Sequence, residues 1–536
     1  MADSNCTNAQ YIDYKSTGYY SKIAVDYIEQ KEDLLPFFLH EVSDKGIENA
    51  IKARANFPQH NRDVLVEELQ KQYASTQSAS IVQQNILSLK DKSTFTLTTA
   101  HQPNIFGGPL YVVYKILHVV KLAQKLSKQY SDKYFVPVYY MGSEDADLDE
   151  LNNITIDSKK YIWHTTQTGA VGRMCSDKNL LSLINEMQAQ IGVEPFGNEW
   201  IGILKASYKE GISVQQATFE FLNHVFGRFG LLVIIPDNAN LKRLFEPIIL
   251  KELQEQFSHK ALQQTVLTLQ EKHYHAQTEG RELNLFYLLN DKRERIEIEN
   301  GLYIVRSLNL QFSQKEITNE VKNYPDRFSA NVVLRGVFQE TILPNIAFVG
   351  GGGELAYWLE LKNVFENANV PYPLLLLRNS LLLINERQKE IIGKLKISFE
   401  VLFKKEHEVL DEILTKRNQD ISLKEELNTI KSVYESLKNK AGEADTTLTQ
   451  HVEALFVKAF KRAEKLEKKI ASAQRKKLVT EQSQIAKLKS DLFPKSSLQE
   501  RVENISGFYA KYGDKIFDNI LKNSLTTEGK FSILEA

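Results

Sequence analysis

Cysteine is scarce in this sequence: only Cys6 and Cys175 occur among 536 residues. Two thiols cannot supply a disulfide framework or a cysteine-rich metal site, and so low a content is typical of a reducing compartment. The N-terminal segment has no apolar core of a signal peptide, and no stretch reaches the roughly 18 apolar residues that a membrane helix needs. These absences predict a cytoplasmic protein with no membrane partner and no metal site.

An excess of charge of one sign is also missing. The chain carries 67 Lys and Arg against 68 Asp and Glu, so its net charge is −1. Such a balance gives no overall attraction to nucleic acid or to an anionic membrane. A basic run lies within residues 461–477, but on a coiled-coil helix such a run is usually a solvated face. We therefore expect no nucleic acid among the partners.

What the sequence does contain is typical of a large folded protein. Hydrophobic residues make up 42% of the chain and charged residues 25%, and this length exceeds one ordinary domain. We expect a core over residues 1–385, which opens with a helical segment and contains inserted connecting segments at roughly 160–230 and 255–330. A coiled-coil hairpin should follow over residues 386–495, and a helical tail over 496–536 should return to the core.

Five apolar segments of the core region predict buried strands, and helical patterns separate most of them. They are Thr94–Ala100, Tyr134–Met141, Gly230–Asp237, Asn345–Val349 and Leu374–Leu377. Between the first two, Tyr111–Leu126 carries apolar residues at helical spacing, which predicts a strand, a helix and a parallel strand in succession. The fold class is therefore α/β. The pair Asn300-Gly301 predicts a small antiparallel ribbon in addition.

The composition changes after Asn385, where glycine and proline nearly vanish and Lys and Glu dominate. Two heptad seams of apolar residues follow, one over residues 423–437 and one over 448–473, with Gly442 between them. This pattern predicts an antiparallel helical hairpin whose second helix runs from about Thr446 to Asp491. A capping signal at residues 416–425 predicts a break within the first helix.

Three of the predicted strands end in polar or glycine-rich segments. His101–Asn104 and Gly107–Gly108 follow the first strand, Glu144–Glu150 follows the second, and Gly350–Gly353 follows the fourth. Because ligands of open α/β sheets bind at the carboxyl ends of the strands, we expect these segments to form one site. A structural interpretation stays open for each: a histidine that caps a helix, a solvated acidic helix start, and a plain turn.

The residue types define the chemistry that such a site can perform. Imidazole and amide groups beside closely approaching backbone can hold a carboxylate or phosphate and move a proton. Carboxylates can hold an amine or act as a general base. The glycine run is neither a P-loop nor a dinucleotide fingerprint, because no Gly-Lys-Ser or Gly-Lys-Thr follows it and Leu355 replaces the last glycine.

Four segments together resemble the family of bacillithiol-biosynthesis cysteine-adding enzymes, the cysteine ligases. They are His101–Tyr111, Gly142–Glu150, Gly169–Arg173 and Phe348–Trp358. The resemblance covers nearly the whole chain, including the coiled-coil region. One departure is Gly352, which stands where the family commonly has the proline of a Gly-Gly-Pro-Gly-Glu sequence.

The resemblance implies a Rossmann-type core, related to class I aminoacyl-tRNA synthetases and nucleotidyltransferases, with connecting insertions and a coiled coil that supports a homodimer. It also implies a ligase that joins cysteine to the amine of glucosaminyl-malate in the last step of bacillithiol biosynthesis. The cofactor is left open, with ATP or another nucleotide as the candidate. The alternative is a non-catalytic coiled-coil interaction protein that binds a nucleotide or a sugar.

From their positions at the ends of the predicted strands, we expect particular roles for individual residues. We expect His101, Glu144 and Asp145 to be catalytic: His101 would transfer a proton or bind a phosphate, and one of the carboxylates would orient the amine. Arg378 would clamp an anion. The other predicted substrate-binding residues are Gln102, Asn104, Gly107, Gly108, Tyr111, Asp147, Gly350, Gly351, Gly352, Gly353, Glu354, Tyr357 and Trp358.

Overall fold

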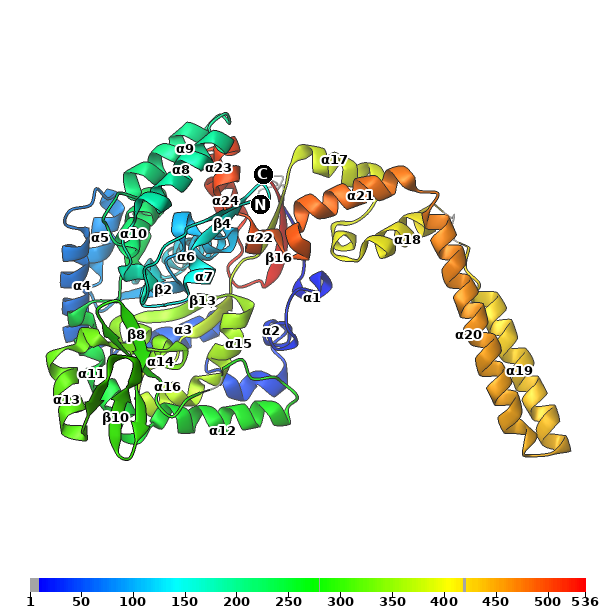
Figure 1. Cartoon of the computed structure of the whole chain (residues 1–536), viewed down its shortest axis with the longest axis horizontal. Helices are drawn as coiled ribbons and strands as arrows, with labels where there is room; N and C mark the ends of the chain where they lie inside the picture. Colours follow the sequence, from blue (N-terminus) through cyan, green and yellow to red (C-terminus); the bar gives the residue numbers. More distant parts are fainter. Residues whose placement is uncertain (1–8, 279, 418–420) are drawn as a thin grey trace. The chain divides into compact units, whose positions relative to one another are not determined.

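The computed structural model describes residues 9–278, 280–417 and 421–536. They form two compact units, shown as ribbons in Figure 1. The first comprises the chain up to Leu383 together with Leu498–Leu534, and the second comprises Ile384–Ser497. Cys175 is exposed and has a free thiol, whereas Cys6 lies outside the described residues. None of the helices in the described part of the chain combines the length and apolar composition of a membrane span.

A five-stranded parallel sheet forms the centre of the first unit (Figure 1). Its strands lie in the order β14, β13, β2, β3, β6. Their bounds are Leu374–Leu377 for β14, Asn345–Gly350 for β13, Thr94–His101 for β2, Tyr134–Met141 for β3 and Leu232–Ile234 for β6. Counted along the chain this is the order 5-4-1-2-3, which is the Rossmann arrangement read from its other edge. The predicted Rossmann-type α/β core is confirmed; the relation to class I synthetases stays a prediction.

The strands form where the sequence is apolar without alternation, because both faces of the sheet are covered. Every residue of β3 from Phe135 to Met141 is buried, so side chains on both faces are shielded from water. The helix α6, Leu110–Gln129, connects β2 to β3 and packs against both strands. A side-chain hydrogen bond also connects β2 to β13, because Thr99 Oγ1 donates to the Val349 carbonyl at 2.8 Å.

Helices and small ribbons surround the sheet. The N-terminal helices are α1 (Tyr14–Thr17), α2 (Lys22–Ile28), α3 (Asp44–Arg54), α4 (Gln59–Tyr73) and α5 (Ser80–Ser88). Between β3 and β6 lie α7 (Leu148–Leu151), the hairpin β4–β5 (Asn153–Ile156, Lys159–Ile162), α8 (Lys178–Ile191), α9 (Gly197–Ser207) and α10 (Val214–Phe226). The helices after β6 are α11 (Ala239–Glu255), α12 (Phe257–Glu271), α13 (Gln314–Asn323), α14 (Val332–Ile342), α15 (Gly352–Glu360) and α16 (Lys362–Ala368).

Two antiparallel sheets occupy the region before β13. One contains β7 (Leu285–Leu289), β8 (Lys292–Arg295) and β12 (Phe328–Ala330), and the other contains β9 (Glu297–Glu299), β10 (Leu302–Val305) and β11 (Leu310–Phe312). Asn300 and Gly301 connect β9 to β10 and both have positive φ, so the predicted hairpin is confirmed.

The C-terminal tail is only partly helical, whereas a helical tail was predicted. It contains α22 (Gln499–Val502), α23 (Ser506–Tyr512) and α24 (Lys515–Asn523), but it ends in β16 (Lys530–Glu535). This strand pairs antiparallel with β1 (Ala9–Asp13), and its other neighbour is β15 (Leu381–Ile384). An all-helical tail was wrong because the final apolar residues find two strands to pair with.

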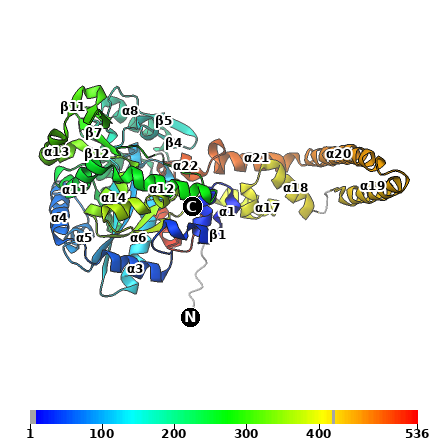
Figure 2. The ribbon, with the colours of Figure 1, turned by 90° about the horizontal axis from the view of Figure 1, so that it is seen from below.

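The second unit is helical, with α17 (Glu386–Leu395), α18 (Glu406–Lys416), α19 (Lys424–Ala444), α20 (Leu448–Arg475) and α21 (Val479–Leu492). Figure 2 shows α19 and α20 side by side, and Tyr434 of α19 packs on Phe456 of α20 with 5.6 Å between ring centroids. The predicted helical hairpin and the break before α19 are confirmed. The turn lies at 445–447, and Gly442 is inside α19.

The predicted single helix from Thr446 to Asp491 is wrong. The helix α20 ends at Arg475 and α21 begins at Val479, because α20 packs mainly along α19 and meets α18 as well, whereas α21 packs on α18. The helix α20 lies along α19, whereas α21 buries Ile485, Leu488 and Leu492 and packs against α18.

Candidate active site

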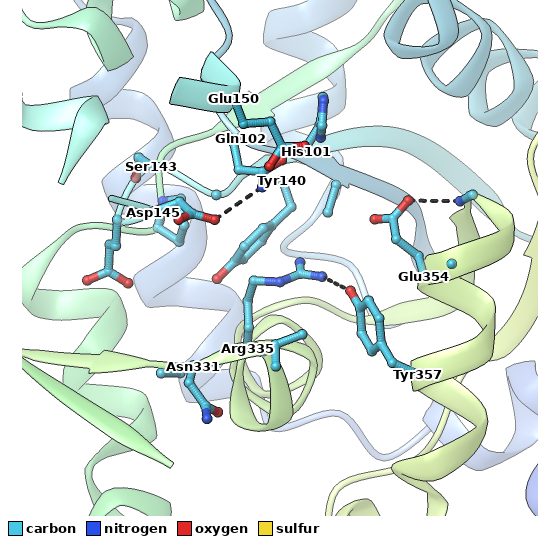
Figure 3. A pocket seen from close by; sticks show the side chains of 18 of the residues that line it. His101, Gln102, Tyr140, Ser143, Asp145, Glu150, Asn331, Arg335, Glu354 and Tyr357 are labelled. Carbon is cyan, nitrogen blue, oxygen red and sulfur yellow. Dashed lines mark hydrogen bonds between the residues drawn. The ribbon is translucent and has the colours of Figure 1, made fainter. Parts of the chain in front are cut away.

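A cavity of about 650 Å³ lies at the carboxyl edge of the parallel sheet, beside the point between β2 and β13 where the strand order reverses. Figure 3 shows it from close by. Its walls include the ends of β2, β3 and β14, the start of α15, and side chains from α6, α14 and β8. The three predicted strand-end segments therefore meet at one cavity.

Most of the predicted site residues line this cavity. They are His101, Gln102, Tyr111, Glu144, Asp145, Gly351, Gly352, Gly353, Glu354, Tyr357 and Arg378. The others lie outside its lining: Asn104, Gly107, Gly108, Asp147, Gly350 and Trp358. We do not propose a ligand contact for these six residues.

Gly107 and Gly108, which follow His101, form a tight turn and do not line the cavity. Gly107 and Gly108 have φ of +84° and +67°, a region that disfavours other residues. A Cβ on Gly107 would lie 2.7 Å from the Phe221 ring. The Gly108 carbonyl accepts a hydrogen bond of 2.5 Å from Asn504 Nδ2, so this turn is fixed by the C-terminal tail.

The remaining three side chains outside the lining have structural surroundings of their own. Trp358 is fully buried and stacks on Phe348 with 4.3 Å between ring centroids. Asp147 caps α7, where its carboxylate accepts from the Glu150 amide at 3.4 Å. Asn104 is buried below the Gly108 turn.

His101 stands at the end of β2, where its Nε2 lies 3.0 Å from the Tyr111 hydroxyl. Burial lowers the pKa of His101 well below its ordinary value, and the nearby charges of Lys115, Arg335 and Arg378 lower it further. Burial also keeps Tyr111 protonated by raising its pKa. The imidazole is therefore neutral at neutral pH and can accept a proton.

Lys115 connects the ends of β2 and β13, and it was not among the residues predicted from the sequence. Its ammonium donates to the Ala100 carbonyl at 2.9 Å and pairs with Glu354, which in turn accepts from the Gly351 amide at 2.8 Å. The spacing of four residues from Tyr111 to Lys115 on one helix face could have revealed it.

Arginines add positive charge to the cavity wall. Arg378 pairs with the buried Glu500 at 2.7 Å and lies over the Tyr111 ring. Arg335, from α14, donates to the Tyr357 hydroxyl at 2.5 Å, as Figure 3 shows. Arg335 had no sequence signal, since it sits in an ordinary amphipathic helix. Three further arginines that line the cavity are Arg281, Arg293 and Arg501.

The acidic wall follows β3. Asp145 accepts from Gln102 Nε2 at 3.1 Å (Figure 3). Glu144 pairs with Lys242, a buried residue of α11, and Lys242 also contacts Asp237 at 3.1 Å. Burial raises the pKa of Glu144, and the Lys242 charge opposes that shift. The cavity thus has the carboxylates of Glu144 and Asp145 after β3, with Arg293 beside them. It also has a cationic wall formed by Lys115, Arg335 and Arg378, whose charges all act on His101.

This arrangement can hold a small molecule that carries both an amine and an anionic group, with a neutral imidazole near its reacting atoms. The amides of Gly352 and Gly353 are free to meet an anion, because a helix start leaves its first N–H groups without intrahelical acceptors. Within the described residues, no group of three His, Cys, Asp or Glu side chains is placed to hold a metal ion.

The free energy of unfolding should depend on pH through the ionisation of Asp237. Although burial opposes its ionisation, Lys242 and Arg173 lower the pKa of Asp237 from 3.8 to about 2. A carboxyl whose pKa is lower in the folded state stabilises it above the unfolded-state pKa, and this stabilisation is lost as the pH falls from about 4 to 2. Over that range the wild type should lose about 2 kcal/mol more than Asp237→Asn.

Urea unfolding at a series of pH values measures this difference. Because Asn cannot ionise, the free energies of unfolding of the two proteins should converge as the pH falls. Parallel curves would show that Asp237 has an ordinary pKa in the folded protein.

Comparison with known proteins gives matches over nearly the whole chain. The family model described as "Bacillithiol biosynthesis BshC, N-terminal Rossmann-like domain" matches residues 7–379, and "Bacillithiol biosynthesis BshC, C-terminal coiled-coil domain" matches residues 381–536. A protein of Flavobacterium johnsoniae is 37% identical over 98% of this chain and 99% of its own length. One of Cytophaga hutchinsonii is 35% identical over 94% of both chains. Both bear the name "Putative cysteine ligase BshC".

Proposed function

The chain belongs to the bacillithiol-biosynthesis BshC family, and from this we propose that it is a ligase that joins cysteine to the amine of glucosaminyl-malate. This reaction would complete bacillithiol. The observation that carries the proposal is the cavity at the switch point, whose lining combines carboxylates after β3 with a cationic wall. Glucosaminyl-malate carries an amine on its sugar ring and two carboxylates on the malate that is joined to the neighbouring carbon, so it offers a partner to the carboxylates and to the cationic wall.

The amine end would lie at Glu144 and Asp145. A carboxylate accepts hydrogen bonds from an ammonium or an amine and so orients its lone pair toward the carbon that it attacks. Glu144 is the better placed for this role, since Lys242 compensates part of its charge and holds one of its oxygens. Asp145 is held by Gln102 from the other side.

The malate end would lie at the cationic wall. Arg335 is the central group of this wall, because the Tyr357 hydroxyl fixes its guanidinium while its charge is not paired with a carboxylate in the contacts of the described residues. Arg378 contributes charge, but Glu500 already occupies one edge of its guanidinium. We therefore propose Arg335 rather than Arg378 as the main anion contact.

His101 would take the proton that the attacking amine loses. The amide forms between the amine nitrogen and the carboxyl carbon of cysteine, while the carboxyl oxygen leaves with its activating group and the proton passes to the imidazole. A carboxylate needs activation before an amine can attack it. The glycine-rich start of α15 fits the phosphate groups of a nucleotide, which is the candidate source of that activation.

We also propose that the chain forms a homodimer through its coiled coil. The support is the set of large apolar side chains that α19 and α20 leave exposed, since an isolated helical pair would otherwise keep them in water. They include Val433, Leu437, Leu448, Leu455 and Leu466.

The test is to incubate the protein with glucosaminyl-malate and ¹⁵N-labelled cysteine, with and without ATP, and to follow the products by mass spectrometry. The expected product has the summed mass of both substrates less one water and contains the label. AMP or ADP that accumulates with the product would identify the activating step. If no labelled product forms in either mixture although a sugar or nucleotide binds, the non-catalytic alternative is correct.

A further inference from the structure

We infer that Arg173 is a positioning residue that holds the Glu144 carboxylate at the cavity by way of Asp237 and Lys242. Arg173 itself does not line the cavity. It ends the segment Gly169–Arg173, which follows the β4–β5 hairpin. The inference rests on the proposed function, in which Glu144 orients the substrate amine.

Four charged side chains of alternating sign connect Arg173 to the cavity. Arg173 binds Asp237 through two parallel hydrogen bonds, from Nε at 2.6 Å and from Nη2 at 2.7 Å, which is the geometry that fixes a carboxylate most firmly. Asp237 lies 3.1 Å from Lys242 Nζ, and the same ammonium donates to Glu144. Asp237 and Lys242 are 3% and 2% exposed, and of the four only Glu144 lines the cavity.

The backbone of the same segment holds the chain on both sides of Glu144. The Val171 amide donates to the Asp145 carbonyl at 2.7 Å, and the Gly172 amide donates to the Ser143 carbonyl at 3.0 Å. Gly172 has to be glycine here, because a Cβ would lie 2.4 Å from the Ser143 carbonyl oxygen. One short segment thus fixes the backbone around Glu144 and, through Arg173, its side chain as well.

The physical reason that Arg173 matters is competition for one ammonium. Glu144 and Asp237 share Lys242. Arg293 of β8 also acts on Glu144, and Asp145 acts in turn on Arg293. Arg173 compensates the charge of Asp237, so Lys242 remains available to Glu144. Without Arg173, Asp237 would draw Lys242 toward itself and would also repel the Glu144 carboxylate. Glu144 would then be displaced and would ionise only at higher pH.

A structural bridge between two loops is the competing interpretation of Arg173, and it predicts a loss of stability alone. The readout therefore has to follow the amine itself. We compare Arg173→Met, which keeps an unbranched stem but no charge, with Arg173→Lys, which keeps the charge but not the paired hydrogen bonds. The control is Arg417→Met, which removes an arginine of similar exposure from its pair with Glu481 in the second unit.

The first measurement is calorimetric binding of glucosaminyl-malate and of malate, which lacks the amine. Arg173→Met should weaken binding of glucosaminyl-malate about tenfold, since a misplaced group loses its oriented contact, and should leave malate binding unchanged. Arg173→Lys should restore part of the loss, and Arg417→Met should match the wild type. Equal effects on both ligands, or none on either, would overturn the inference.

The second measurement is the pH dependence of kcat/KM. In the wild type, kcat/KM should fall at acid pH as Glu144 is protonated, and we call this fall the acid limb. The acid limb of Arg173→Met should lie at higher pH than that of the wild type, and the acid limb of Arg417→Met should be unchanged. An unmoved limb in Arg173→Met would refute the role of Arg173 in holding Glu144. If the wild type forms no product but still binds glucosaminyl-malate with the expected sensitivity to Arg173, the ligase proposal fails and the positioning role stands.

Discussion

Replacing His101 by alanine is expected to lower kcat/KM for product formation by about a thousandfold, which is within the range that a positioned general base contributes. The reason is the charge state of the imidazole. Burial and three neighbouring cations keep the pKa of His101 well below its ordinary value, so the imidazole is uncharged in the free enzyme and becomes a stronger base only when an anion offsets those cations. His101 is the one histidine among the described residues that line the cavity.

The same cations explain how His101 could become more basic when substrate binds. An anion held at Arg335 would offset part of the positive charge around the imidazole and raise its pKa. Proton uptake by His101 would then be coupled to correct placement of the malate end. Glucosamine without the malate should consequently have a lower kcat as well as a higher KM than glucosaminyl-malate.

The fold should survive the loss of His101. The side chain is neutral, faces the cavity and has one hydrogen-bond partner in the described structure, the Tyr111 hydroxyl at 3.0 Å. Tyr111→Phe is the matched control, because it removes that hydrogen bond and leaves the imidazole; its kcat/KM should fall far less. Steady-state kinetics and urea unfolding of both variants test this prediction. Near-normal turnover of His101→Ala would exclude His101 as the base.

The sheet could be predicted from the sequence because its strands are buried on both faces and therefore read as unbroken apolar runs between turn signals. Tyr134–Met141 was predicted with the bounds that β3 has. The helix α20 was predicted too long because residues 476–493 contain no glycine or proline to mark its end, and a local pattern does not reveal which partner each part of a helix meets. The same limit hid the final strand β16, whose partner β1 lies at the other end of the chain.

The candidate site was predictable only where it follows a strand. His101, Glu144 and Gly351 follow buried strands directly, and the sheet brings them to one edge. Lys242 and Arg335 lie inside helices, and no local pattern marks them. Only the packing of α11 brings Lys242 to Glu144, and only the packing of α14 brings Arg335 to the cavity. Gly107 was predicted to bind substrate but packs against the Phe221 ring. The sequence could not distinguish the two, because a glycine pair after a histidine is compatible with either contact.

Replacing Glu144 by glutamine is expected to lower kcat/KM by about a hundredfold or more, since the amine loses a charged acceptor of the kind that contributes this factor in general base catalysis. Glutamine has nearly the same shape, so packing is kept. Lys242 also keeps a partner, because Asp237 remains 3.1 Å from its ammonium. The loss should therefore appear in catalysis and in binding of the amine rather than in stability.

The pH dependence separates this role from a general loss of charge at the cavity. Burial raises the pKa of Glu144, and only the ionised carboxylate can accept from the amine, so wild-type kcat/KM should fall as the pH decreases through that raised value. Glu144→Gln should lack this limb and stay at its reduced level. Glu150→Gln is the control, because Glu150 is a second carboxylate of the cavity lining. It should keep both the limb and most of the activity. A Glu144→Gln variant that retains the wild-type acid limb would assign that ionisation to another group, and the amine would then have to be oriented by Asp145.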